Sequence, residues 1–163
     1  MRDGAVSLPH LRQFRRLLDV LSLPPHLADA LVDWLDRDFE PRGANGAEDR
    51  YYQDLDNGYL AANGPIADVT ELALVRGFDD EARARLRPFV TALPKRTSVN
   101  VNTAPPEILT ALIEGMDLSE ARALAAQRER AWFRDLADFS RALGTGHTIA
   151  AQDLGVSSDY FTS

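Results

Sequence analysis

The chain has 163 residues, a formal net charge of −7 from 25 acidic and 18 basic residues, and no cysteine. Its length fits one domain or two very small ones, and a hydrophobic content of 45% is enough to build a core. The lack of cysteine excludes disulfides and thiolate metal sites. The excess of acidic residues argues against a nucleic-acid-binding protein that relies on neutralising phosphates.

Hydrophobic spacing predicts two helices at the start of the chain. Leu11, Phe14 and further leucines recur at helical intervals up to Leu21, with Ser7 as a candidate cap, and Pro24-Pro25 ends that helix. The second helix begins near Leu27, carries its apolar residues on one face, runs into an acidic stretch and ends near Pro41.

The charge is concentrated in residues 29–56, which hold nine acids and three bases and therefore a net charge of −6. The other 135 residues carry 16 acids and 15 bases, or −1. Residues 39–67 contain several glycines and little periodicity, which predicts a long loop. Three tyrosines in this loop favour an ordered structure, because a long loop inside a compact domain is usually functional or held in place.

This acidic loop is the strongest candidate for a chemical site. Calcium takes about 6–8 oxygen ligands in flexible geometry, and a loop rich in Asp, Glu, Asn and Gly can wrap around it. The stretch is not an EF-hand, because Pro41 and Ala47 stand where that loop needs glycine and glutamate. A solvated acidic face without an ion is the alternative. The ligands assigned by chemistry are Asp36, Asp38, Glu48, Asp49 and Asp56.

Short helices are predicted in the second half of the chain. They cover residues 68–77, 79–89, 103–113, 119–130 and 135–143, with a short extended segment at 98–101. Leu74–Asp79 resembles Leu112–Asp117 at an offset of 38 residues, and each match is a helix, a glycine turn and a helix. Two ordinary helical hairpins explain this repeat equally well.

The predicted fold class is therefore mainly α: a small domain of short helices with helix-hairpin-helix or SAM-like units, a long ordered acidic loop and little β-structure. The helical domain spans residues 1–155, undivided or as two subdomains, 1–67 and 68–155. An extended tail, 156–163, follows it.

Motifs for catalysis are missing: the sequence has no metalloprotease, nucleophile-elbow, phosphate-loop or dinucleotide-binding motif. We therefore expect a protein that is not an enzyme. A helix-hairpin-helix module for nucleic acid is the alternative function, suggested by the repeat and by the string from Ser98 to Leu109. Glu114 and Asp117 flank the hairpin glycine, however, and would repel a phosphate.

No segment of this sequence is expected to cross a membrane. The longest stretch without charge, Asn57–Ala67, has 11 residues, whereas a spanning helix needs about 20.

Five motifs occur in an order that is similar to a known family. They are Asp33–Asp38, Gly46–Asp49, Tyr59 with Asn63, Glu71-Leu72 with Val75–Phe78, and Asn100–Ala104. Together they resemble general secretion pathway protein K, the large minor pseudopilin of bacterial type II secretion systems, over nearly the whole chain.

This resemblance implies a helical domain inserted into a pilin-like α/β domain, with Val156–Phe161 returning towards the pilin sheet. It also implies an inner-membrane helix that this chain lacks, and a place at the tip of the periplasmic pseudopilus beside the I-type and J-type minor pseudopilins. The resemblance further implies a protein that is not an enzyme and that binds calcium. Secreted substrate and the outer-membrane secretin are further expected partners.

Overall fold

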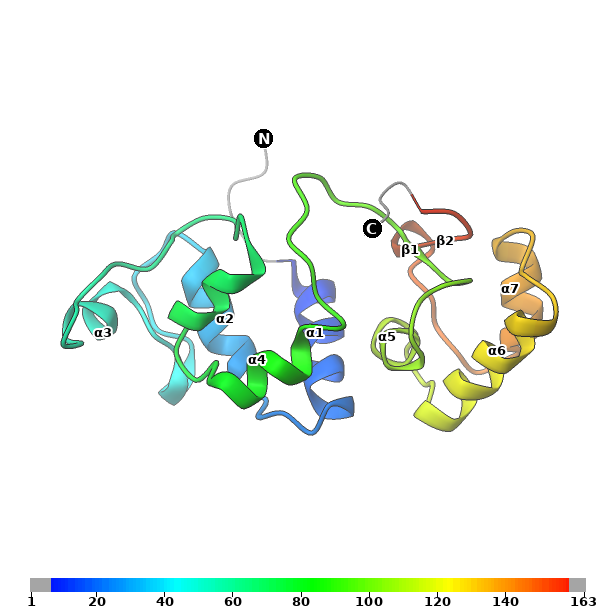
Figure 1. Cartoon of the computed structure of the whole chain (residues 1–163), viewed down its shortest axis with the longest axis horizontal. Coiled ribbons are helices and arrows are strands. Elements are labelled where there is room, and N and C mark those ends of the chain that lie inside the picture. Colours follow the sequence, from blue (N-terminus) through cyan, green and yellow to red (C-terminus); the bar gives the residue numbers. More distant parts are fainter. Residues whose placement is uncertain (1–6, 159–163) are drawn as a thin grey trace. The chain divides into compact units, whose positions relative to one another are not determined.

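The computed structural model describes residues 7–158 and divides the chain into two compact units, Met1–Pro94 and Lys95–Ser163. Both units are mainly helical (Figure 1), which confirms the predicted fold class. The subdomain boundary expected after residue 67 lies inside the first unit. There the backbone N–H of Asn63 donates to the carbonyl of Trp34, and Leu72, Val75 and Phe78 are buried.

The first unit contains four α-helices and two 3-10 helices within its described residues. They are α1 (Leu8–Val20), α2 (Leu27–Leu35), η1 (Gly43–Asn45), α3 (Asp49–Gln53), η2 (Val69–Leu74) and α4 (Asp80–Leu86). The second helix was predicted to continue to about Pro41, which is wrong: Asp36 already has an extended backbone, with φ −81° and ψ −179°. The predicted long loop therefore starts early and includes the short helix α3.

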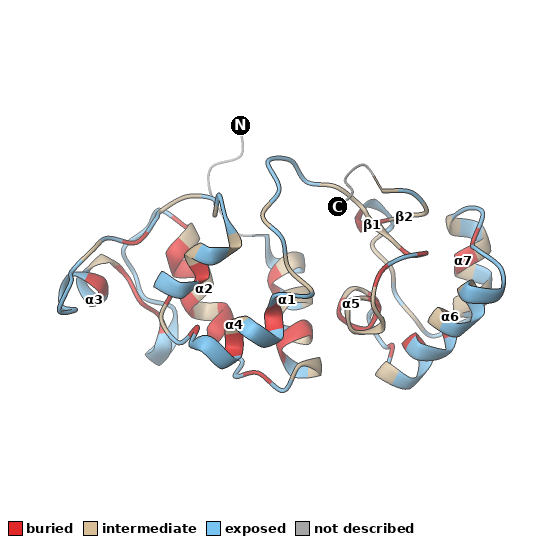
Figure 2. Ribbon diagram, viewed as in Figure 1, coloured by how far each residue is buried: buried red, intermediate tan, exposed pale blue. Residues whose placement is uncertain are grey.

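The core of this unit forms where the apolar sides of α1, α2 and α4 meet. Leu18, Leu27 and Leu86 are fully buried, and Val32 and Trp34 are almost fully buried. Figure 2 shows buried residues along α1, α2 and α4, whereas the outer sides of α1 and α4 are exposed. Burial of these side chains is the main source of stability for helices this short.

The turn between η2 and α4 follows the sequence pattern. Asp68 caps η2 and forms a capping box with Glu71, while the Asp79 side chain accepts from the backbone N–H of Ala82 at the start of α4. Gly77 lies between them with φ +83°, and a Cβ atom there would lie 2.9 Å from the Leu27 side chain. The backbone angle thus favours glycine, and a Cβ atom would also displace the end of the Leu27 side chain.

The second unit is built from helices around a very small sheet. Its elements are β1 (Val99–Asn100), α5 (Pro106–Leu112), α6 (Leu118–Arg130), α7 (Leu136–Leu143), η3 (Ala151–Asp153) and β2 (Leu154–Gly155). The two strands pair in parallel, Val99 opposite Leu154 and Asn100 opposite Gly155. Little β-structure was predicted, and this is confirmed.

Two local predictions need correction in this unit. The helix predicted at residues 103–113 begins later, because Pro105 occupies the N-cap position of α5, which starts at Pro106. Of the predicted extended tail, residues 159–163 lie outside the described part of the chain, and Val156 packs against the core of the unit.

Among the described residues, no helix combines the length and the apolar character that crossing a bilayer requires.

Asn102 joins the segment after β1 to the connection between α6 and α7. Its side-chain amide donates to the carbonyl of Phe133 at 3.0 Å and accepts from the N–H of Phe133 at 2.9 Å. All of these groups are shielded from water, since Asn102 is only 7% exposed and Phe133 only 5%. The pair fixes Phe133 against Phe139 in the core, with ring centroids 5.2 Å apart.

We expect Asn102→Ala to lower the free energy of unfolding by about 2–3 kcal/mol, because it leaves two backbone groups of Phe133 buried without a partner. Chemical denaturation measures this change. Thr103→Ala, one residue away at an exposed position, is the control and is expected to have little effect. Equal stability of the two variants would contradict the role given to Asn102.

Candidate metal centre

A buried aspartate in the last turn of α2 holds the acidic loop in place. The Asp33 side chain is fully buried and accepts from the backbone N–H of Ala47 at 2.8 Å and of Arg42 at 3.0 Å. Both donors belong to the loop that follows α2. One carboxylate therefore folds residues 42–47 back against the helix that precedes them.

This fold brings three carboxylates together: Asp36, Asp38 and Glu48. Each offers an oxygen atom, and these atoms all lie within 4.8 Å of one another. Asp36 follows α2 directly, and Glu48 is the N-cap residue of α3, so the group joins the two ends of the loop. We call these three residues the carboxylate cluster.

Two members of the carboxylate cluster are buried without hydrogen-bond partners. Asp36 and Glu48 are each 5% exposed, and all four of their carboxylate oxygens are shielded and accept no hydrogen bond within the described chain. The side chain of Arg42 forms an ion pair with Asp36, at 3.5 Å from Oδ2. Buried carboxylates normally have hydrogen-bond donors or a metal ion beside them, so these oxygens are available as ligands.

The electrostatics of the cluster oppose ionisation when no cation is near. Burial, followed by the charges of Asp33, Asp36 and other neighbouring acids, raises the pKa of Glu48 to about 7. Burial and the neighbouring Asp38 also raise the pKa of Asp36, and Arg42 offsets this only in part. A divalent cation would remove this penalty, because it neutralises the carboxylates and replaces their lost hydration.

The remaining two predicted ligands lie elsewhere in the structure. Asp49 accepts a hydrogen bond from the backbone N–H of Ala61 at 2.9 Å, and so holds another part of the loop. Asp56 is exposed after the end of α3. The structure thus groups Asp36, Asp38 and Glu48, and it does not bring Asp49 or Asp56 into this group.

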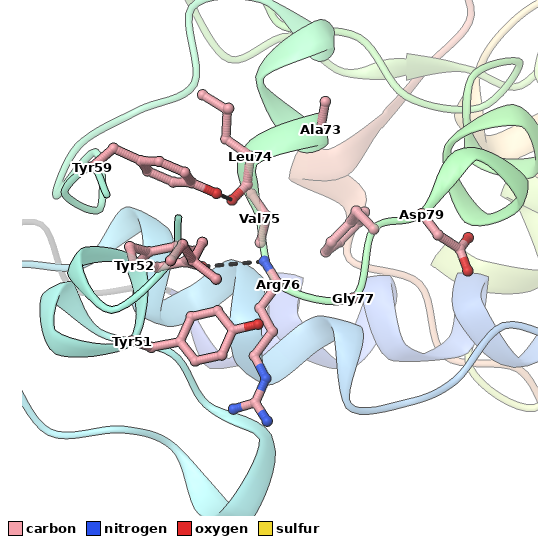
Figure 3. Close-up of a pocket in the computed structure, with 11 residues that line it drawn as sticks. Tyr51, Tyr52, Tyr59, Ala73, Leu74, Val75, Arg76, Gly77 and Asp79 are labelled. Atoms are coloured by element: carbon pink, nitrogen blue, oxygen red, sulfur yellow. Dashed lines mark hydrogen bonds between the residues drawn. The ribbon is translucent and has the colours of Figure 1, made fainter. Parts of the chain in front are cut away.

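A layer of aromatic side chains holds α3 and the rest of the loop against the unit. The ring of Tyr52 is fully buried, meets Trp34 edge-on at 5.1 Å between centroids and stacks with Tyr59 at 5.3 Å. Figure 3 shows the hydroxyl of Tyr52 accepting from the backbone N–H of Arg76, and that of Tyr59 donating to the carbonyl of Leu74. Burial raises the pKa of Tyr52 to about 12, so this hydroxyl stays neutral.

Arg76 closes this aromatic layer on the side that leads to the loop. Its guanidinium lies 4.6 Å from the ring centroid of Tyr51 and donates to the carbonyl of Gly46 at 2.9 Å. The residues shown in Figure 3 line a cavity of about 300 Å³ between α3 and the η2–α4 turn. Gly46 is two residues from Glu48, so the aromatic layer holds the same loop that carries this member of the carboxylate cluster.

Sequence reasoning missed two residues that shape the cluster, Asp33 and Arg42. A usable sequence signal was present for Asp33, because this acid stands between the apolar residues Val32 and Trp34 near the end of a predicted helix. The amide oxygen of Asn63, which the predicted ligand set does not include, is also buried without a partner within the described chain. The backbone of Asn63 has a positive φ of +47°.

Family models match almost the whole chain. A model described as "Type II secretion system (T2SS), protein K" matches residues 1–95, and a second model of the same description matches residues 99–157. The two matches meet close to Pro94, where the chain divides into its compact units.

Curated relatives and a solved structure agree with these models. The chain is 40% identical over 147 residues to "Type II secretion system protein K" of Pseudomonas aeruginosa, with 88% of this chain and 44% of the relative covered. The identity to the protein of the same name from Klebsiella pneumoniae is also 40%, over 172 residues, with 98% and 52% covered.

One similar solved structure is a chain of "the GspK-GspI-GspJ complex from enterotoxigenic Escherichia coli Type 2 Secretion System". The TM-score is 0.70 at 25% identity, with 97% of this chain and 59% of that chain covered. The chain thus spans about half the length of the curated relatives it matches. On the two family models, which together match nearly every residue, this chain belongs to the type II secretion system protein K family.

Proposed function

We propose that this chain is the helical domain of a minor pseudopilin at the tip of the type II secretion pseudopilus, where it supports protein secretion across the outer membrane. The observation that carries this proposal is the match of both compact units to protein K family models. The proposed role is structural and non-enzymatic: the domain adds bulk to the tip of the fibre and offers an exposed face to other proteins.

The similarity to the relatives supports proposals for the partners and the location. The similar Escherichia coli chain was solved in a complex with GspI and GspJ, and we propose that I-type and J-type minor pseudopilins assemble with the protein that contains this chain. We place it in the periplasm, held in the inner membrane by a segment outside this sequence. Secreted substrate and the outer-membrane secretin are proposed contacts of the exposed face.

The helix-hairpin-helix hypothesis gains no support from the family. Gly115 has a positive φ of +87°, as such a hairpin requires, but exposed Glu114 and Asp117 flank it. This arrangement disfavours a phosphate, so we do not propose binding to nucleic acid.

We expect the periplasmic part of the full-length protein to form a ternary complex with the I-type and J-type pseudopilins of the same bacterium. Size-exclusion chromatography with light scattering measures its mass. Each protein run alone is the control, and separate elution of all three in the mixture would contradict the proposed assembly.

We further propose that the carboxylate cluster binds calcium as a structural ion. Asp36, Asp38 and Glu48 supply up to six carboxylate oxygens, and loop carbonyls or water complete the shell that calcium prefers. Four of these oxygens are buried and accept no hydrogen bond within the described residues, which supports a cation between them. The ion would bridge the end of α2 and the start of α3, and so stabilise the loop that connects them.

Calcium is therefore expected to raise the melting temperature by about 5–10 °C at a concentration near 100 times its dissociation constant, relative to chelator. Asp36→Asn and Glu48→Gln should lose most of this shift, because each removes a buried ligand. Differential scanning calorimetry provides the measurement.

Asp54→Asn is the matched control for calcium, since it removes one exposed acid of the same loop outside the carboxylate cluster. Asp56→Asn tests a ligand that the sequence predicted and that the structure leaves outside the cluster. A shift equal in all four variants, or no shift in the unaltered protein, would disprove this calcium site.

The raised pKa of Glu48 predicts a specific pH dependence without calcium. Between its ordinary pKa of 4.5 and its folded value of about 7, the folded state binds more protons than the unfolded state. Stability in chelator is therefore expected to fall as the pH rises through this window. Glu48→Gln should lack this part of the pH dependence, and saturating calcium should suppress it, because the ion favours the charged carboxylate.

Thermal unfolding across this pH range, with and without chelator, compares the two proteins. Asp54→Asn again provides the control. Identical pH profiles for the unaltered protein and Glu48→Gln in chelator would show that Glu48 does not titrate in this window.

A further inference from the structure

One basic side chain, that of Arg42, lies against the buried acids of the acidic loop. Its Nη2 atom is 3.5 Å from Oδ2 of Asp36, and its Nε atom is 3.9 Å from Oδ1 of Asp33. The side chains of both acids are buried, whereas that of Arg42 is 43% exposed. The charged end of an exposed side chain thus lies beside two buried carboxylates.

These contacts of the Arg42 side chain are ion pairs that are too long to be good hydrogen bonds. Both oxygens of Asp36 remain without a hydrogen bond in the described chain. Burial and the neighbouring Asp38 keep the pKa of Asp36 raised, although Arg42 acts in the opposite direction. Calcium contacts carboxylate oxygens at about 2.3–2.6 Å, so it would compensate the charge of Asp36 more completely than the guanidinium does.

The side chain of Arg42 can leave Asp36 without disturbing the loop. The backbone N–H of Arg42 donates to the Asp33 carboxylate at 3.0 Å, and this bond does not involve the guanidinium. An exposed ion pair contributes little net stability, because water solvates both groups when the pair separates. The guanidinium can therefore turn into water while the backbone stays in place.

The other two bases of the acidic stretch differ from Arg42. Residues 29–56 contain three basic residues, Arg37, Arg42 and Arg50. Arg37 and Arg50 are exposed, and within residues 7–158 neither of them forms an ion pair. They carry the same charge in the same stretch, so they are matched comparisons for Arg42.

We propose that Arg42 is a tethered counter-ion of the carboxylate cluster and competes with a divalent cation for Asp36. Without metal, the guanidinium compensates part of the charge of Asp36. When a cation binds, the ion takes over the Asp36 oxygens and the guanidinium turns into water. This inference rests on the calcium site proposed above and adds the residue that limits the affinity of that site.

The competition has a direct consequence for the calcium response. Because the ion must displace a positive charge that is already in place, Arg42 lowers the affinity for calcium and moves the response to higher calcium concentrations. A supporting role would have the opposite effect. If Arg42 held Asp36 in the orientation that the ion needs, its removal would weaken calcium binding. The sign of the change in affinity thus separates the two roles.

Isothermal titration of the intact chain with calcium chloride, at an ionic strength of about 0.15 M, measures this affinity. Arg42→Gln is expected to bind calcium at least about fivefold tighter than the unaltered chain. Arg42→Lys keeps a positive charge on a long side chain and should restore most of the difference. Arg37→Gln and Arg50→Gln should change the affinity by less than about twofold, because salt screens exposed charges that contact no ligand.

Thermal unfolding supplies a second readout of the same competition. In chelator, Arg42→Gln is expected to melt about 2–4 °C below the unaltered chain, because it removes the ion-pair partner of a buried acid. Saturating calcium should close this difference, since the ion then replaces the guanidinium. Arg50→Gln should show no difference that depends on calcium.

Three results would overturn the role of Arg42 and leave the calcium site standing. They are equal affinity of Arg42→Gln and the unaltered chain, weaker binding by Arg42→Gln, and equal tightening by Arg37→Gln and Arg50→Gln. A different result, the absence of calcium binding in every protein including Arg42→Gln, would disprove the calcium site itself and this inference with it.

Discussion

The acidic loop of this protein depends on one buried carboxylate, that of Asp33. It accepts hydrogen bonds from two backbone N–H groups of the loop and carries its charge at the end of α2 without any exposure to water. Burial raises its pKa, and these hydrogen bonds act in the opposite direction. These hydrogen bonds fold the loop back against α2 and so bring Glu48 close to Asp36. They also place the start of α3 where the aromatic layer covers it. Burying the Asp33 carboxylate costs free energy, and the hydrogen bonds that it accepts from the loop offset part of this cost.

A second consequence is that the loop has two sides that differ in chemistry. On one side, Tyr52 packs against Trp34 and binds the backbone of Arg76, and this contact is independent of any ion. On the other, the carboxylate cluster holds several buried oxygens with no hydrogen-bond partner in the described chain. The polar groups of the aromatic side already have hydrogen-bond partners, whereas a cation or a proton would stabilise the carboxylate side. Calcium would thus tighten an existing fold instead of creating one.

The sequence predicted the helices well, because most of them have both an apolar stripe and a clear end signal. Asp79, Asp117 and Asp135 each accept from a backbone N–H at the start of a helix, and Gly77 and Gly115 mark turns with positive φ. It failed where the contacts are distant in the chain. Asp33 meets Ala47 across 14 residues, and Asn102 meets Phe133 across 31, and no local spacing encodes either contact. Asp49 was taken for a ligand because composition alone cannot show that its carboxylate binds the N–H of Ala61.

The parallel pair of β1 and β2 has a mechanical meaning for the second unit. It joins residues 99–100 near the start of the unit to residues 154–155 near its end, so the described ends of the unit leave the sheet in opposite directions. A pull between these ends slides one strand along the other and loads all hydrogen bonds of the pair at once, including that from the N–H of Val101 to the carbonyl of Gly155. Peeling, which breaks such bonds one after another, is avoided. A sheet of two residues per strand thus acts as a clamp that shields the helices between its strands from tension along the chain.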